Sequence, residues 1–265
     1  MWIIFAVLSA LTKGCGNIMN KVSSDRIDSF VLTFTTRIVG LLIGIIAYLL
    51  FNDTPNSFSN QFFAAVLVSG GLSAFAVILR FDAFKQGEVS HLIPLGNFVP
   101  VVGALFAVVL LNEVPSLLGA LGIVIVTTGA YVLHVQSSHV NWYEPLQEIY
   151  KLPASRKMLL MVVLVGISIN IDKIGLDYVS PYMWAIAIAL AQLLLVTPKA
   201  LKKLPEVTTA VRDYWLMITV TATLSMTAFI FQMLSFEAGG LVGYTIAIKR
   251  TDTCLLYTSP SPRDA

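Results

Sequence analysis

Polar side chains recur within an apolar stretch near the N-terminus, at steps of four, four and three residues: Ser9, Lys13, Asn17 and Asn20. This spacing places all four on one face of an α-helix. On an otherwise apolar helix, such a face points to the interior of a helix bundle or to a wet cavity. The alternative is that these groups only join neighbouring helices by hydrogen bonds. We expect Lys13 and Asn17 to line a cavity, because an unhydrated lysine is costly in lipid. Asn20 and Lys21 lie near the end of the stretch, where side chains reach the surface.

Two later apolar stretches also carry polar residues at helical spacing. The first holds Asn170, Lys173 and Asp177, with Asp172 on a neighbouring face, and the second holds Thr221, Ser225 and Gln232. Hydroxyl groups more often join membrane helices than bind solutes, so Gln232 is the better candidate in the second stretch. Asn170 is the candidate in the first. Asp172 is the best acid at depth and therefore the candidate coupling acid.

A third stretch contains two prolines, Pro94 and Pro100. Each lacks a backbone donor and leaves the carbonyl four residues earlier, on Ser90 or Gly96, without its helical partner. Beside Asn97, the freed carbonyls form a candidate polar site at mid-depth. A proline kink used only for packing explains the same residues equally well.

Arg37 lies inside another apolar stretch. It either pairs with an acid or meets an anionic group of a solute, and the sequence leaves both open. Arg80 lies close to Asp82 near the end of its stretch, so we interpret it as ion-paired or as reaching the membrane surface. Glu113 lies at a turn, and we interpret it as structural.

The composition requires that these residues lie in a membrane protein. Hydrophobic residues make up 57% of the 265 positions and charged residues 12%, and the mean hydropathy is +0.81. Soluble domains carry about 25% charged residues, so the chain must face lipid. The net charge of +2, without a basic run, gives no reason to expect nucleic-acid binding. Cys15 and Cys254 lack metal-ligand spacing, so we expect no disulfide, metal or cofactor.

The elements that position the polar residues are segments of about 20 apolar residues, the length that crosses the hydrocarbon core. We predict all-α spanning helices at about 2–22, 29–51, 61–82, 91–111, 116–135, 157–178, 181–198 and 213–235. The first segment lacks the basic region and cleavage site of a signal peptide, so we interpret it as a spanning helix. Residues 136–156 are polar and predict a linker between two halves.

The two halves share short sequence matches at a constant separation of 152 positions. Asn20-Lys21-Val22 reappears as Asp172-Lys173-Ile174, Leu72-Ser73 as Leu224-Ser225, and Phe84-x-x-Gly87 as Phe236-x-x-Gly239. The first half holds five helices. Because this number is odd, the second half must have the opposite orientation in the membrane. The sequence therefore predicts an inverted repeat of five helices, with sites at the interface between repeats.

The C-terminal end departs from this repeat. The apolar stretch 240–251 is too short to cross the membrane. Residues 254–265 resemble the translation of a sequencing adapter rather than a natural tail, although their Ser and Pro content also fits a disordered tail. We expect a second repeat at 157–253 that is truncated, with eight full helices and part of a ninth, so that the chain is a fragment.

Several motifs together resemble one family. Ala83-Phe-Lys-Gln-Gly-Glu-Val-Ser90 is followed by Pro94 and Pro100, by Leu111-Asn-Glu113, and by Gly122 and Gly129. This order resembles the EamA-type branch of the drug/metabolite transporter superfamily, with Asn112 where the family usually has glycine. Arg37 and the stretch Gly243-Tyr-Thr-Ile-Ala-Ile-Lys-Arg250 are also similar to family positions.

The resemblance implies ten helices in two repeats, 1–135 and 157–253 here, and secondary transport of a metabolite or drug-like solute. Asn97 corresponds to Lys249 across the repeat, so we expect the predicted pathway residues to converge: Lys13, Asn17, Arg37, Asn97, Asn170, Gln232 and Lys249. Lys13 and Lys249 favour a small-molecule substrate with an anionic group. We expect a monomer or homodimer in a prokaryotic cytoplasmic membrane.

Orientation and two rival functions stay open. Lys and Arg gather in the loops after the odd-numbered segments, which places the N-terminus outside, whereas the family more often has it inside. A membrane-embedded enzyme is disfavoured because the sequence lacks a His-Glu-x-x-His motif or paired deep acids. A non-transporting anchor or receptor subunit needs neither a repeat nor inward-facing polar stripes.

Overall fold

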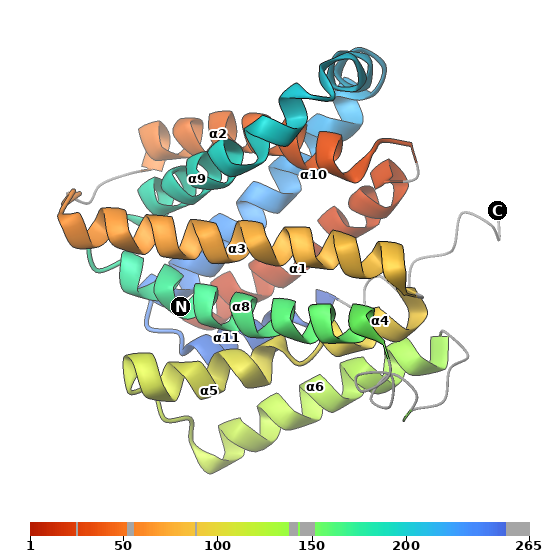
Figure 1. Ribbon diagram of the computed structural model, residues 1–265. Helices are drawn as coiled ribbons and strands as arrows, with labels where there is room; N and C mark the ends of the chain where they lie inside the picture. Colours follow the sequence, from red (N-terminus) through yellow and green to blue (C-terminus); the bar gives the residue numbers. More distant parts are fainter. Residues whose placement is uncertain (25, 52–55, 88, 138–142, 144–151, 253–265) are drawn as a thin grey trace.

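The computed structural model describes residues 1–24, 26–51, 56–87, 89–137, 143 and 152–252 (Figure 1). Within these ranges the regular structure is α-helical. The helices are α1 (Trp2–Ser24), α2 (Ser29–Phe51), α3 (Asn60–Gln86), α4 (Val89–Gly96), α5 (Val99–Leu111), α6 (Leu117–Ser137), α8 (Pro153–Gly175), α9 (Pro181–Leu201), α10 (Leu204–Glu237) and α11 (Val242–Lys249). The predicted all-helical class is confirmed. The predicted 254–265 tail and most of the 136–156 linker lie outside the described residues.

The helices have the length and exposure of a membrane protein. In the described part of the chain, seven spans are long and apolar enough to cross a bilayer, the α4–α5 pair counting as one, and α6 contributes a shorter apolar run. Large apolar side chains lie on the outside, such as Leu49, Val109 and Leu118, which is 82% exposed. Ser69 and Asn170, by contrast, are fully buried. An apolar outside around a partly polar inside is stable only in lipid.

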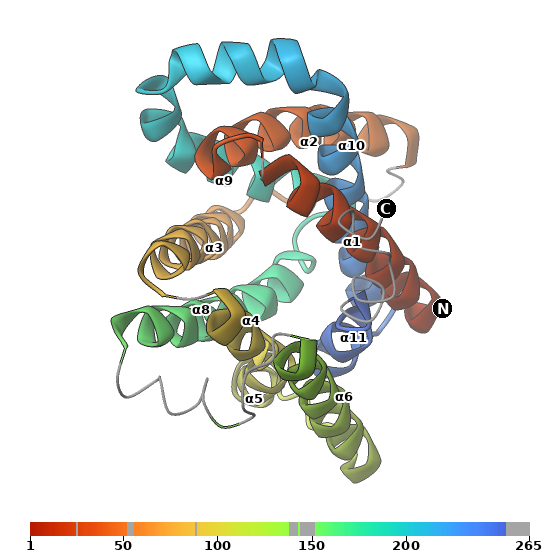
Figure 2. The ribbon, with the colours of Figure 1, turned by 90° about the vertical axis from the view of Figure 1, so that its right-hand side faces the viewer.

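Helix α10 differs from the prediction. The apolar segment predicted at 213–235 is the end of a longer helix, Leu204–Glu237, whose backbone departs from helical geometry at Tyr214 (φ −130°, ψ 23°). The first part of α10 runs across the top of Figure 2 before the chain bends into the bundle. Its Val207 and Ala210 pack against Val31 of α2. This part was missed because it is too polar for a search based on apolar length.

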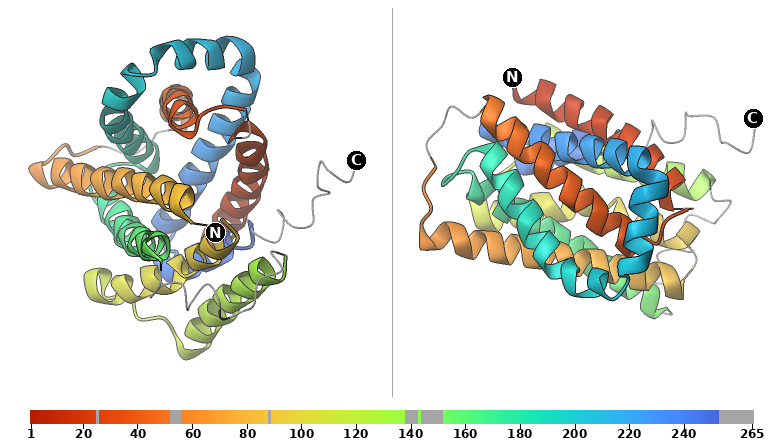
Figure 3. Two further views of the ribbon diagram at one scale, coloured as in Figure 1. Left: turned by 45° about the vertical axis from the view of Figure 1, so that its right-hand side comes forward. Right: turned by 90° about the horizontal axis from the view of Figure 1, so that it is seen from above.

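The main contacts join a helix of the first half to a helix of the second half, and each has a counterpart when the halves are exchanged. We call this the exchange pattern. α3 packs on α8, and α1 packs on α10; α5 packs on α8, and α11 packs on α1. Figure 2 and the left view of Figure 3 show α1 beside α10 and α3 beside α8. Moved by 152 positions, α1 would span 154–176, against Pro153–Gly175 for α8, and α2 would span 181–203, against Pro181–Leu201 for α9.

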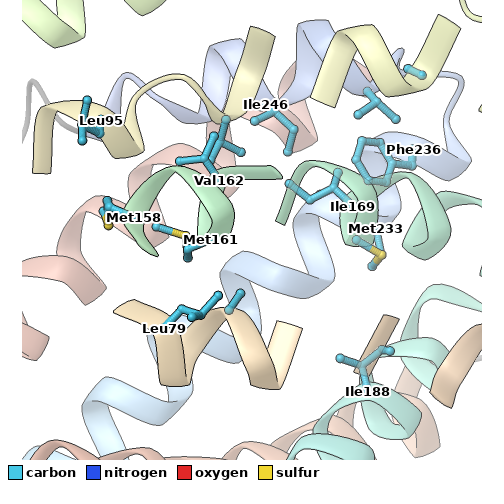
Figure 4. Packing of buried hydrophobic residues seen from close by; sticks show 14 of the residues in the cluster. Leu79, Leu95, Met158, Met161, Val162, Ile169, Ile188, Met233, Phe236 and Ile246 are labelled. Carbon is cyan, nitrogen blue, oxygen red and sulfur yellow. The ribbon is translucent and has the colours of Figure 1, made fainter. Parts of the chain in front are cut away.

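The core gathers around α8. Figure 4 shows Met161 of α8 facing Leu79 of α3, while Val162 faces Ile246 of α11. Glycine permits the closest approach: a Cβ on Gly166 would lie 2.7 Å from the Val102 side chain and 3.3 Å from the Gly103 nitrogen. Small residues commonly hold membrane helices this close. The packing fixes α8 against both α3 and α5.

Candidate functional site

Five basic side chains from four helices lie within electrostatic reach of one another. We call them the basic cluster: Lys13 of α1, Arg37 of α2, Arg80 of α3, and Lys249 and Arg250 at the end of α11. The charge of Lys13 interacts with those of Arg37, Arg80 and Arg250, and that of Lys249 interacts with Lys13. Arg80 is exposed, whereas the other four side chains are half-buried. The helices thus bring together cations that are far apart in the sequence.

Two of the cluster's cations bind neutral acceptors. Lys249 Nζ donates to Oε1 of Gln232 on α10. An Arg250 guanidinium nitrogen donates to the Gly96 carbonyl at 2.8 Å. A neutral oxygen satisfies a hydrogen bond without cancelling the charge of its donor. These two contacts place α11 against α10 and α4.

Two acidic groups, Asp252 and Asp172, interact electrostatically with the cluster. Asn17 Nδ2 donates to Asp252 Oδ2 at 2.9 Å, and Asp252 interacts electrostatically with Lys13 and Lys249. Asp172, buried in α8, accepts hydrogen bonds from Ser69 Oγ at 2.5 Å and Trp184 Nε1 at 3.1 Å. Asp172 also interacts electrostatically with Lys249. The candidate coupling acid therefore lies in the α3–α8–α9 packing, within electrostatic reach of the cluster.

Lys13 and Arg37 differ from Lys249 and Arg250, which donate hydrogen bonds to neutral acceptors. Among the described residues, neither side chain makes a hydrogen bond or an ion pair within 4 Å. Both lie inside predicted spans, Lys13 near the middle of Trp2–Asn20 and Arg37 in Phe30–Phe51. A cation at this depth requires water, an anion or a ligand.

The fourth predicted span is broken between its two prolines, Pro94 and Pro100. The helix stops between Gly96 and Val99, and Asn97 N and Phe98 N donate to Pro94 O and Leu95 O in a tight turn. The Gly96 carbonyl, freed by Pro100, accepts from Arg250. Arg250 thus supplies a donor to one of the freed carbonyls that the sequence placed at a candidate polar site.

Two predicted pathway residues make contacts between helices. Asn97 Nδ2 donates to the Ala130 carbonyl of α6 at 3.0 Å. Asn170 Nδ2 donates to the carbonyls of Gly103 at 3.0 Å and Gly166 at 2.7 Å. Lys13, Arg37 and Lys249 belong to the cluster, Gln232 accepts from Lys249, and Asn17 donates to Asp252, which interacts electrostatically with Lys13. The structure therefore brings five of the seven predicted side chains together.

Two residues at the cluster were not singled out in the sequence interpretation: Arg250 and Asp252. Arg80 was interpreted as ion-paired or as reaching the membrane surface; its side chain is exposed, and the described ion pair of Asp82 is with Lys157, at 3.7 Å. The repeat offset carried a signal, because Arg80 corresponds to Gln232, itself a candidate. Arg250 directly follows Lys249, and its target, the Gly96 carbonyl, was predicted to lack its helical donor, but the sequence does not show which side chain replaces that donor.

A second polar centre lies at the other end of α11. Glu113 forms an ion pair with Lys173 and accepts from the Val242 nitrogen at 2.9 Å. Lys173 also donates to the Gly240 carbonyl at 2.7 Å. Nearby, Trp2 and Tyr244 stack with ring centroids 6.2 Å apart. This centre connects the end of α5, α8 and the start of α11.

Comparison with known proteins gives the family. The model of the EamA-like transporter family matches residues 1–135, half of the chain. The chain belongs to the EamA-like transporter family. A curated relative from Sinorhizobium sp., named "Uncharacterized transporter in cobO 3'region", is 26% identical over 136 residues, which are 51% of this chain and 96% of the relative.

A solved structure titled only "Crystal structure of protein" has the same fold as this EamA-like chain. Its TM-score is 0.69 at 15% identity, and the match covers 98% of this chain and 89% of the other. The family, the named relative and the apolar helices together identify an integral membrane protein that transports small solutes.

Proposed function

We propose that this EamA-like protein is a secondary transporter that works by alternating access between two inverted repeats. The repeats are residues 1–135 and 157–253, joined by the linker at 136–156. The exchange pattern of helix contacts supports this arrangement, because α3–α8 and α1–α10 are the same pair when the halves are swapped. The cytoplasmic membrane of a prokaryote is the proposed location.

The basic cluster is the proposed substrate site, and its convergence from four helices is the observation that carries the proposal. Lys13, Arg37 and Lys249 contribute charge, while Asn17 and Gln232 contribute amides. Asn97 and Asn170 remain proposed pathway residues. Asn97 lies at the α4–α5 break and donates to α6, and Asn170 of α8 donates to α5. Asp172 remains the proposed coupling acid.

A thiol-accessibility experiment tests alternating access directly. In full-length protein from which Cys15 and any other native cysteine have been removed, Asn17→Cys is reconstituted into vesicles and treated with a membrane-impermeant maleimide from each side in turn. We expect labelling from both sides, because the site opens alternately to each. Leu121→Cys is the control: Leu121 is 51% exposed on α6, where lipid surrounds it, so it should stay unlabelled.

The rival function is a membrane anchor or receptor subunit that does not transport. It requires no change of access, so Asn17→Cys would be labelled from one side only or not at all. Either result contradicts alternating access. Catalysis is not proposed, since the family is one of transporters.

A further inference from the structure

The start of α11 is enclosed by helices of the first half of the chain. α11 packs on α5, α1 and α6, and it lies between α1 and the α5–α6 pair in Figure 2. Val242 N donates to the Glu113 carboxylate at 2.9 Å, and a Cβ on Gly243 would lie 2.8 Å from Ala104 Cβ. Val242 and Thr245 are fully buried. No solute can pass between α5 and α11 while these contacts hold.

Tyr244 extends the closure to the starts of α1 and α6. Its hydroxyl accepts from Ser116 N at 2.9 Å and lies 3.2 Å from Ser116 Oγ, and its ring stacks on Trp2. A Cβ on Gly119 would collide with the Tyr244 ring and hydroxyl, so glycine leaves the room that this ring occupies. Ser235 Oγ of α10 donates to the Trp2 carbonyl at 3.0 Å. One aromatic side chain therefore connects three helices at this end.

The link between α10 and α11 is suited to a hinge. Gly239 has a φ of +90°, and a Cβ there would meet nothing within 4 Å. Gly240 follows it directly, and α11 itself is eight residues long. Glycine adopts a positive φ without strain, and domain hinges lie at a few residues that absorb changes of φ and ψ. Rotation about these two glycines would carry the start of α11 away from α5.

The same short helix reaches the basic cluster at its other end. Lys249 lies seven residues after Val242, which is about 10 Å along a helix. It donates to Gln232 of α10, and the next residue, Arg250, donates to the Gly96 carbonyl at the end of α4. A movement of the start of α11 must therefore also shift the contacts that position these two cations.

We propose that Glu113, Lys173 and Tyr244 form the gate that closes the solute pathway at the end of the bundle where Trp2 lies, and that α11 moves away from α5 when this gate opens. The inference rests on the proposed function, since alternating access requires a gate at each end. The competing interpretation is a permanent joint, in which α5 and α11 stay in contact throughout.

A disulfide between α5 and α11 tests the gate. Ala104→Cys and Gly243→Cys are added to full-length Asn17→Cys protein without native cysteines, because their Cβ atoms lie within about 1 Å of disulfide spacing. Vesicles are treated with an impermeant maleimide from each side, and peptide mass spectrometry reads the label at position 17. Protease removal of an N-terminal tag identifies the side on which Trp2 lies.

Oxidation should lower labelling of position 17 from the Trp2 side by at least about tenfold, because the open population is removed. Labelling from the opposite side should persist, and reduction should restore both. Equal labelling from the Trp2 side before and after oxidation would show that α5 and α11 need not separate, which overturns the gate.

Glu113→Gln tests the gate without a crosslink. It removes the charge that holds Lys173, so the ratio of labelling from the Trp2 side to labelling from the opposite side should rise by about tenfold. Asp28→Asn, which breaks the exposed ion pair with Lys203, should leave the ratio unchanged. A loss of stability alone would raise labelling from both sides equally, and an unchanged ratio for Glu113→Gln would contradict the gate.

The two proposals fail in different ways. Labelling of Asn17→Cys from one side only, in reduced protein, contradicts alternating access and the gate with it. Labelling from both sides that neither the disulfide nor Glu113→Gln alters contradicts the gate alone and leaves alternating access standing.

Discussion

The Glu113 carboxylate holds Lys173 of α8 with one oxygen and the backbone N–H of Val242, 2.9 Å away at the start of α11, with the other. A carboxylate at a helix N-terminus satisfies an unpaired donor and interacts favourably with the helix dipole. Lys173 extends the connection to the Gly240 carbonyl. The two halves of the chain are thus tied together at this end, since Glu113 belongs to the first and Lys173 and Val242 to the second.

Replacing Glu113 with alanine should destabilise the protein by about 3–5 kcal/mol, because it leaves the largely buried Lys173 without its counter-ion. Thermal or denaturant unfolding in detergent measures the change. Asp28→Asn is the matched control. It breaks an ion pair with Lys203 (2.9 Å) whose side chains are 38% and 37% exposed, and it should cost less than about 1 kcal/mol. Equal losses of unfolding free energy for the two variants would show that the Glu113 contacts stabilise the protein no more than an exposed ion pair does.

The Arg250–Gly96 contact should depend on Pro100. Arg250→Gln should cost about 1.5–3 kcal/mol, as expected for a hydrogen bond from a charged donor. Pro100→Ala supplies a backbone N–H within reach of the Gly96 carbonyl, so in that background the Arg250 substitution should cost less. A double-mutant cycle on unfolding free energies measures the coupling. Strictly additive effects would mean that Arg250 does not replace the missing donor.

Gly166 should tolerate no side chain. Gly166→Ala places a methyl group 2.7 Å from Val102 and 3.3 Å from the Gly103 nitrogen, so α5 and α8 must separate at a cost of about 1–3 kcal/mol. Gly122→Ala is the control, because a Cβ there meets nothing within 4 Å. Unfolding midpoints compare the two. A neutral Gly166 variant would contradict the tight α5–α8 crossing.

Hydropathy predicts the spanning helices well, because bilayer thickness fixes their length. It predicts neither the polar first part of α10 nor the kink at Tyr214, since both depend on packing against α2. For the site, side-chain type and helical spacing were enough to single out Lys13 and Gln232. The hydrogen bonds of Asn97 and Asn170 go to backbone carbonyls of other helices. Such bonds depend on how helices are placed against each other, which sequence periodicity does not contain.

Solute uptake by reconstituted vesicles tests the central claim most directly. We predict that Lys13→Met and Lys249→Met, in the full-length protein, each abolish uptake while expression and membrane insertion stay at the wild-type level. Lys202→Met should transport normally, because its side chain is exposed and outside the cluster. The reason is that an uncompensated lysine at membrane depth costs about 2.5–3.5 kcal/mol, so it is retained for a ligand. Wild-type uptake by both cluster variants would contradict a substrate site at the basic cluster.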